Sequence, residues 1–326
     1  MTRMELFGTI ALAVALGACG GSGGDTSAPT LPPLQITSSN AKTVSGGVFG
    51  TSGAVGGLGD SSRGIATQSA GGGGSSLAGL SERVLLQAFR EQQSLTISIV
   101  VTRDVPCESG SITLRANDAD NNGELSTGDT ADATFNQCAN GGETLSGSLS
   151  ISDVVVTGDA ASQVAPWGLA ATFAFNNLVL TQAGEESSIN GSFSFSVDTP
   201  DNTSSNTSIR ANSITVTDSG FTETLSNFDL TAGVDTSTLA YSTEFDGTFS
   251  SQRVDGSVTF DTTQTFRGVG EGFPSEGELL ITGANESSVR LIAIDSVNVR
   301  LEVDENGDGA VDQAIDTAWE ELGNRT

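Results

Sequence analysis

Apolar residues recur at every second position through much of the chain from residue 95 onward. The clearest runs are 95–101, 173–175, 193–197, 239–245, 258–260, 289–293 and 297–303. The positions between them are mostly Ser, Thr, Asn and Asp. Because successive side chains of a strand point to opposite faces, this pattern predicts strands that bury one face and expose the other. We predict a mainly β fold, an antiparallel meander built as a sandwich, a half-barrel or an elongated curved sheet.

Several of these segments begin with a glycine. Gly147, Gly191, Gly247 and Gly256 each open an alternating stretch such as Gly-Ser-Phe-Ser-Phe. We interpret them as turn or bulge glycines. Their irregular spacing favours a meander over a short-period solenoid.

The chain before the strands divides into two parts. Residues 19–75 are rich in Gly, Ser and Thr and poor in large apolar residues, so we predict a disordered tether with a reach of roughly 40 Å. The β-rich domain then spans 76–326 and begins with a helix over about 76–93. In that helix one stripe is apolar, and Ser76 or Ser81 is the candidate cap. The stripe consists of Leu77, Leu80, Val84, Leu85 and Ala88.

Residues 1–18 have the features of an export signal. Arg3 precedes an apolar run over 6–16 that is too short for a permanent membrane span. The run closes with Leu16-Gly17-Ala18-Cys19, which resembles the lipobox of bacterial lipoproteins. The resemblance implies acylation of Cys19, a membrane partner reached through that lipid anchor, and, since Gly20 follows, an outer-membrane location. It leaves open whether the protein faces the periplasm or the cell surface.

Two cysteines remain after Cys19. Cys107 and Cys138 flank the segments 112–114 and 133–135 and the acidic loop between them. In an oxidising compartment an even pair predicts a disulfide, here one that clips the two ends of a hairpin together.

The loop inside this hairpin resembles an EF-hand calcium loop. Oxygen-bearing residues stand at positions one, three, five, seven, nine and twelve, with Gly123 at the sharp turn in position six. Position seven would contribute its backbone carbonyl. The candidate ligands are Asp118, Asp120, Asn122, Glu124, Ser126 and Asp129. Asp replaces the usual Glu at position twelve, and the flanking segments are predicted strands, so this is an EF-like loop in a β setting.

A second acidic loop follows the predicted strand 297–303. It resembles the calcium loops of dockerin-type and other non-EF proteins, with a short helix expected within 314–322. Its candidate ligands are Asp304, Asn306, Asp308, Ala310, Asp312 and Asp316. The alternative for both loops is a metal-free Asp/Asn/Gly turn. We predict Ca²⁺ as the cofactor, since weak sites suffice outside the cell.

Composition excludes several chemistries. The chain has no histidine, and its single lysine is Lys42, so histidine triads and histidine metal sites are impossible. With 13 Lys+Arg against 40 Asp+Glu and a net charge of −27, nucleic acid is not an expected partner. A carboxylate enzyme such as a glycoside hydrolase needs neither His nor Lys, but Trp167, Tyr241 and Trp319 are the only Trp and Tyr residues for stacking on sugars.

These observations predict a protein that is not an enzyme. We expect a calcium-stabilised lipoprotein of the outer envelope with a structural, adhesive or assembly role. The sequence does not identify its protein or glycan partner. The alternative is a periplasmic carrier of lipid or another apolar ligand. The order of helix and meander is similar to that of periplasmic lipoprotein chaperones, where a half-barrel is covered by a helical lid, and a concave Phe-rich face would hold the ligand.

Overall fold

The computed structural model describes residues 31–56, Ser81, Leu85 and residues 100–323 except 141, 161, 183, 219 and 271. The predicted signal and lipidation site, and the stretch 95–99 of the first predicted strand, lie outside the described residues.

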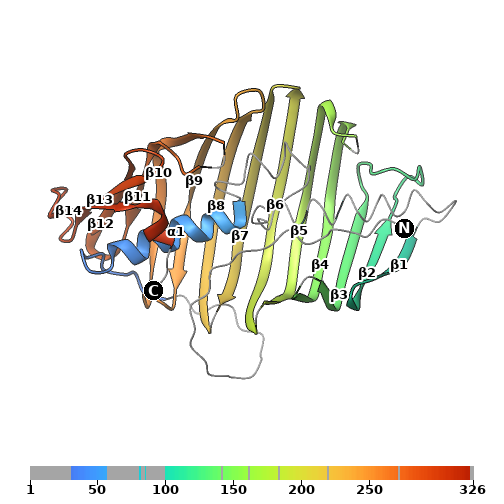
Figure 1. Cartoon of the computed structure of the whole chain (residues 1–326), viewed down its shortest axis with the longest axis horizontal. Coiled ribbons are helices and arrows are strands. Elements are labelled where there is room, and N and C mark those ends of the chain that lie inside the picture. Colours follow the sequence, from blue (N-terminus) through green and yellow to red (C-terminus); the bar gives the residue numbers. More distant parts are fainter. Residues whose placement is uncertain are drawn as a thin grey trace.

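A single antiparallel sheet dominates the fold (Figure 1). Its fourteen strands follow one another in sequence order, and the sheet is not closed, which confirms the predicted β meander. The strands are β1 Val100–Pro106, β2 Ser109–Asn117, β3 Thr130–Asn140, β4 Glu143–Asp159, β5 Val164–Gln182, β6 Glu185–Asp201, β7 Ser204–Asp218, β8 Phe221–Asp235, β9 Ala240–Ser251, β10 Gly256–Val269, β11 Glu276–Thr282, β12 Ser288–Ala293, β13 Asn298–Asp304 and β14 Gln313–Ala318.

The two faces of the sheet differ as the alternation predicts. In β6, Phe193, Phe195 and Val197 are buried, whereas Ser194 and Ser196 are exposed. The same division runs along the other long strands, so that the inner face forms one hydrophobic cluster with a high content of phenylalanine. Neighbouring rings on this face pack against one another, for example Phe173 and Phe193 at 5.3 Å between centroids.

Bulges interrupt the central strands, and glycines mark several of them. Gly147, Gly191 and Gly247 have φ of 100°, 118° and 154°, a region that side chains disfavour. Gly147 pairs with Phe135 and Gly191 with Phe175 across the neighbouring strand. A Cβ at Gly147 would overlap the backbone of Asn177, and one at Gly191 would overlap the backbone of Ser213, so neither position has room for a side chain. The bulge interpretation is confirmed at these three positions, whereas Gly256 simply begins β10.

Part of the predicted disordered tether is ordered, and that prediction is wrong for residues 31–56. Residues 41–56 form helix α1 (Ala41–Gly56), which lies against the sheet (Figure 1). Val44, Val48 and Val55 are fully buried. The remainder of the predicted tether, 19–30 and 57–75, lies outside the described residues.

The glycines of this helix explain why its composition misled the prediction. A Cβ at Gly47 would lie 2.8 Å from the ring of Phe249, and one at Gly46 would overlap the backbone of Leu322. The glycines therefore let the helix backbone approach the sheet and the C-terminal segment more closely than any side chain permits.

Helix α1 occupies the hollow of the curved end of the sheet. It contacts β8 and β9, then β12 and β13, and the short helix α4 (Trp319–Gly323). Its Phe49 lies 4.8 Å from the ring of Trp319 and 5.8 Å from that of Phe266. A helix thus fills the hollow, and it comes from a segment earlier than the predicted helix at 76–93.

Only two residues of the predicted helix 76–93 are described. Ser81 and Leu85 are both helical and fully buried, and Leu85 belongs to the hydrophobic cluster of the sheet. The rest of this predicted helix lies outside the described residues.

The predicted disulfide is present between Cys107 and Cys138, with 5.4 Å between their Cα atoms. Cys107 lies in the β1–β2 turn and Cys138 near the end of β3, where Ser109 pairs with Ala139. The bridge therefore clips the ends of the β2–β3 hairpin, and a loop of 31 residues corresponds to about 3–4 kcal/mol of stabilisation.

Enlarging Gly47 tests the docking of α1. We expect Gly47→Ala to lower the free energy of unfolding by about 1–3 kcal/mol, because the new Cβ collides with the buried ring of Phe249. The control is Thr43→Ala at an exposed position of the same helix, which should leave stability unchanged or slightly higher. Denaturant titration measures both. In a helix that does not pack on the sheet, replacing Gly by Ala raises stability. A Gly47→Ala variant that is more stable than the parent protein would therefore contradict the packing.

Candidate metal loops and a buried polar network

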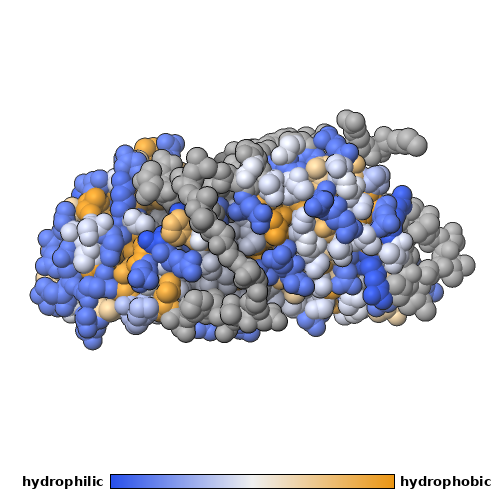
Figure 2. Space-filling model, turned by 90° about the horizontal axis from the view of Figure 1, so that it is seen from below, coloured by the Kyte–Doolittle hydropathy of each residue, from blue (hydrophilic) through white to orange (hydrophobic). Residues whose placement is uncertain are grey.

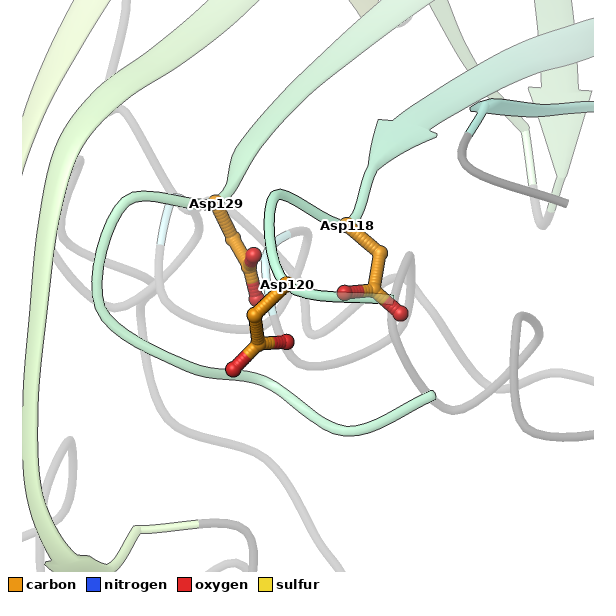
Figure 3. Close-up of side chains that lie close together, drawn as sticks. All are labelled: Asp118, Asp120 and Asp129. Carbon is orange, nitrogen blue, oxygen red and sulfur yellow. The ribbon is translucent and has the colours of Figure 1, made fainter. Parts of the chain in front are cut away.

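The first acidic loop connects β2 to β3 and brings three of its predicted ligands together. One carboxylate oxygen each from Asp118, Asp120 and Asp129 lies within 4.8 Å of the others (Figure 3). Asp118 and Asp129 are 1% and 0% exposed, whereas Asp120 is exposed. Within the described ranges, no other group of three or more acidic or cysteine side chains converges in this way.

The backbone of the loop folds around the first aspartate. The carboxylate of Asp118 accepts hydrogen bonds from the amides of Asn122, at 3.3 Å, and Gly123, at 2.7 Å. Gly123 has φ of 77°, as the predicted sharp turn requires, and the amide of Glu124 donates to the side chain of Asn122 at 2.6 Å. Leu125 is buried, so the apolar position of the pattern anchors the loop.

Asp129 closes the loop. Its carboxylate accepts from the amide of Ala119, at 2.8 Å, and from the amide and hydroxyl of Ser126, at 2.6 and 3.2 Å. Burial raises the pKa of Asp129 and the charge of Asp118 adds to the rise, while the hydrogen bonds from Ala119 and Ser126 oppose it. Ionised Asp129 is therefore costly without a cation, and an all-oxygen cluster of this kind suits Ca²⁺.

The second acidic loop connects β13 to β14 and is organised around Asp304. This side chain, 8% exposed, accepts from the amides of Gly307 and Gly309, both at 2.7 Å. Burial acts to raise the pKa of Asp304, but the surrounding amides of residues 306–309 outweigh it and lower the pKa.

The other side chains of this loop serve its turns. Asn306 accepts from the amide of Asp308 at 2.9 Å, Asp308 from that of Ala310 at 2.8 Å, and Asp312 from that of Glu305 at 2.9 Å. The amides thus supply the hydrogen bonds to these oxygens in the described loop.

Asp316 does not join this loop, and its assignment as a candidate ligand is corrected. It lies in β14 opposite Arg300 of β13, and its two oxygens accept from the guanidinium at 2.7 and 3.2 Å. Arg300 holds the pKa of Asp316 below its usual range. The expected helix within 314–322 likewise begins only at Trp319, because residues 313–318 continue the sheet.

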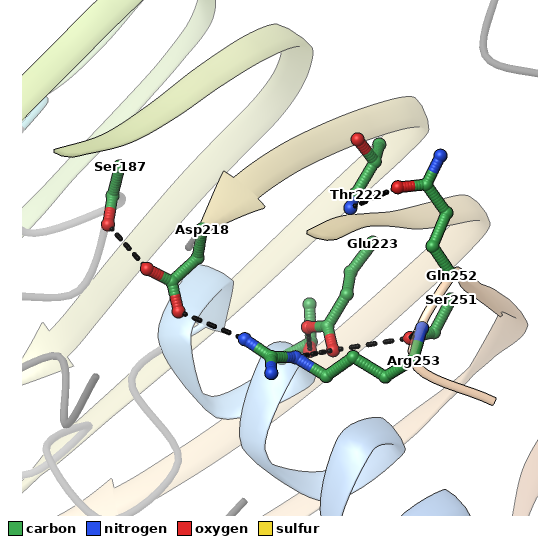
Figure 4. A network of polar contacts seen from close by, with 8 residues as sticks. Ser187, Asp218, Thr222, Glu223, Ser251, Gln252 and Arg253 are labelled. Atoms are coloured by element: carbon green, nitrogen blue, oxygen red, sulfur yellow. Dashed lines mark hydrogen bonds and ion pairs between the residues drawn. The ribbon is translucent and has the colours of Figure 1, made fainter. Parts of the chain in front are cut away.

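A buried polar network, which the sequence analysis did not single out, lies beside α1 on the inner face (Figure 4). Its residues come from the strands β6 to β9 and from the β9–β10 turn. Asp218 and Glu223 lie 3.4 and 3.6 Å from nitrogens of Arg253. The side chains of Arg253 and Glu223 are only 17% and 7% exposed. Thr51 of α1 donates to Glu223 at 3.0 Å, and Ser187 donates to Asp218 at 3.0 Å.

This network gives α1 a polar attachment to the sheet. One guanidinium serves two carboxylates, and its carbon lies 4.5 Å above the ring of Phe221. The sequence contains one signal for this buried network. Glu223 has the same period-two phase as the buried Leu225 and therefore points inward, which is a position where an unpaired charge is costly.

Comparison of the chain with protein-family models, with curated proteins and with solved structures finds no significant match. In the described part of the chain, no helix has the length and apolar character needed to cross a membrane.

Removing the shared cation tests the network. We expect Arg253→Met to cost about 3 kcal/mol of unfolding free energy, because Asp218 and Glu223 lose their nearby counter-charge while the aliphatic packing is kept. Arg210→Met is the matched control, since Arg210 pairs with Asp229 but is 71% exposed, and it should cost at most about 1 kcal/mol. Urea unfolding of both variants decides. Equal losses would show that the network contributes no more than a surface pair.

Proposed function

We propose that the protein is a non-catalytic, calcium-stabilised lipoprotein of the outer envelope with a structural, adhesive or assembly role. The observation that carries the calcium part is the convergence of Asp118, Asp120 and Asp129 in a loop with EF-hand spacing. The lipobox-like residues Leu16 to Cys19 support the anchor. The oxidising location that they imply agrees with the Cys107–Cys138 disulfide.

The outer face of the sheet supports a role in contact with other molecules. Hydroxyl side chains stand in register across four neighbouring strands, from Ser192 of β6 through Ser213 and Ser226 to Thr248 of β9. Such rows form a broad polar surface that offers hydrogen-bond donors and acceptors to a protein or a glycan.

The inner face supports a structural role in a different way. Its buried carboxylates Asp218 and Glu223 are engaged by Arg253 and by hydroxyl groups. These contacts attach α1 to the sheet, so the two carboxylates have a structural task.

One observation favours the alternative, a carrier of lipid or another apolar ligand. A small pocket opens between α1 and the strands β9 and β10, and its lining is largely aromatic. The lining residues are Phe49, Tyr241, Thr243, Phe245, Phe266, Phe273 and Pro274. Mass spectrometry of gently purified protein discriminates between the two proposals, since a stoichiometric lipid that co-purifies would favour the carrier.

Calcium should raise the melting temperature of the protein, tested on the mature chain carrying Cys19→Ser. At 1 mM Ca²⁺ and a dissociation constant of about 10⁻⁴ M, binding adds about 1.4 kcal/mol relative to EGTA. We expect Asp118→Asn to abolish this gain, while Asp153→Asn, at an exposed position of β4, retains it. An unchanged midpoint in the parent protein would remove calcium from the proposal.

The calcium response should also depend on pH. The folded state holds the proton of Asp129 more tightly than the unfolded state, because the pKa of Asp129 is raised. Protons therefore compete with the cation at a higher pH than for an ordinary aspartate, and the gain should disappear as the pH falls through this raised value. Melting curves with calcium and with EGTA across an acidic pH series measure this. A gain that stays constant down to the ordinary aspartate range would contradict a ligand role for Asp129.

A further inference from the structure

The segment before α1 is attached to one end of the sheet by backbone hydrogen bonds. The amide of Ser257 donates to the carbonyl of Pro32 at 2.9 Å, and the amide of Leu34 donates back to Ser257 at 2.8 Å. The hydroxyl of Ser257 donates to the carbonyl of Leu31 at 3.0 Å. The amide of Ala284 donates to the carbonyl of Leu34 at 2.7 Å. The chain is thus held at the start of β10 and at the turn after β11.

Further contacts continue along the same end. Ile36 is fully buried, and its amide donates to the hydroxyl of Ser287 at 2.9 Å. The amide of Ser38 donates to the carboxylate of Glu305 at 2.6 Å. We call this surface, formed by residues 31–40, 283–287 and 304–308 at the turns beside β10 to β13, the docking end. It is at the lower left in Figure 1.

From these contacts we infer that the docking end faces the lipid bilayer. The inference rests on the acyl anchor at Cys19 in the proposed function. Twelve residue steps separate Cys19 from Leu31, and a fully extended chain covers at most about 3.3–3.6 Å per step, or roughly 40 Å in all. Leu31 therefore lies within about 40 Å of the lipid. This is shorter than the predicted tether of 19–75, because residues 31–56 belong to the folded body.

The dimensions of the sheet decide which parts can then touch the membrane. Strand β10 ends at Val269, twelve residue steps from Ser257, so its far end is roughly 40 Å away at about 3.3 Å per residue. The edge strand β1 is nine strands away, or roughly 43 Å at about 4.8 Å per strand. Either part would reach the bilayer only if the segment from Cys19 to Leu31, which we call the leash, were fully extended. The docking end, where the chain from Cys19 enters the folded body, is the part nearest to the anchor.

The surface of this end is polar and acidic. Figure 2 looks at the molecule from below, and its described surface is mostly hydrophilic, with small apolar areas between polar ones. The charged side chains of the docking end are Glu286, Asp304, Glu305 and Asp308, without Lys or Arg. This end therefore does not insert into the acyl chains, and the short segment after Cys19, rather than attraction to the lipid, holds it near the headgroups.

The opposite end consequently points away from the membrane. It carries the loop 118–129 and the turns that join β4 to β5, β6 to β7 and β8 to β9, because strands of a meander reverse direction at each turn. The first acidic loop and the disulfide thus lie at opposite ends of the β2–β3 hairpin. Soluble partners would meet the loop end first.

The test is energy transfer from a labelled cysteine to an acceptor on lipid headgroups, with the lipidated full-length protein in phosphatidylethanolamine/phosphatidylglycerol vesicles. Ser39→Cys places the label at the docking end, and Ser237→Cys places it in the β8–β9 turn at the opposite end. Both serines are exposed turn residues that share a hydrogen bond with a neighbouring side chain. The label at position 39 should lose most of its emission and the label at 237 should keep most of it.

Two controls separate the possible failures. If the protein that keeps its native Cys19 does not float with the vesicles, the anchor of the proposed function is wrong. If the anchored protein shows equal transfer from both labels, the anchor stands and the orientation is overturned. Inserting 20 Gly/Ser residues after Ser27 should abolish the difference between the labels, and a difference that survives the insertion would show that the leash is not its cause.

Discussion

The structure depends on burying one entire face of a single wide sheet. In a sandwich, each sheet covers the other, but here all fourteen strands belong to one sheet. The inner rows of Phe, Leu, Ile and Val must therefore find other partners. At the curved end those partners are α1, α4 and the strands β12 and β13 that face back across α1. The aromatic contacts of Phe49 with Phe245, Phe266 and Trp319 mark the centre of that packing.

Glycine makes this arrangement possible in two different ways. In the strands, Gly147 and Gly191 have positive φ at bulges, where the backbone of the neighbouring strand, at Asn177 and at Ser213, leaves no room for a Cβ. In α1, Gly46 and Gly47 remove side chains where the helix passes Leu322 and Phe249. The same residue type thus shapes both the curved wall and the helix that fills it. The carboxylates at the end of the inner face are accommodated because Arg253 lies between them.

Much of the fold could be predicted because alternation is a direct consequence of strand geometry. The strand type, the bulge glycines, the cysteine pair and the course of the 118–129 loop all follow from short-range spacing. Strands β7 and β8 were missed because bulges shift their phase. Their buried residues are three apart between Ala211 and Ile214 and between Leu225 and Phe228, so the alternation changes phase within each strand.

The remaining errors concern partners that are distant in sequence. Helix α1 was assigned to a tether because its Gly and Ser content signals disorder unless a surface waits to receive it. Asp316 was assigned to a loop because its pairing with Arg300 depends on the β13–β14 register. Pairings of this kind are not encoded in local spacing. They become visible only when the sheet is assembled.

The central claim is that residues 41–56 belong to the folded core, and amide hydrogen exchange of the mature protein tests it most directly. If α1 is packed as described, its amides should exchange as slowly as those of β8 and β9, through the same global opening. Exchange of the α1 amides at the rate of an unstructured peptide, with β8 and β9 still protected, would contradict the account.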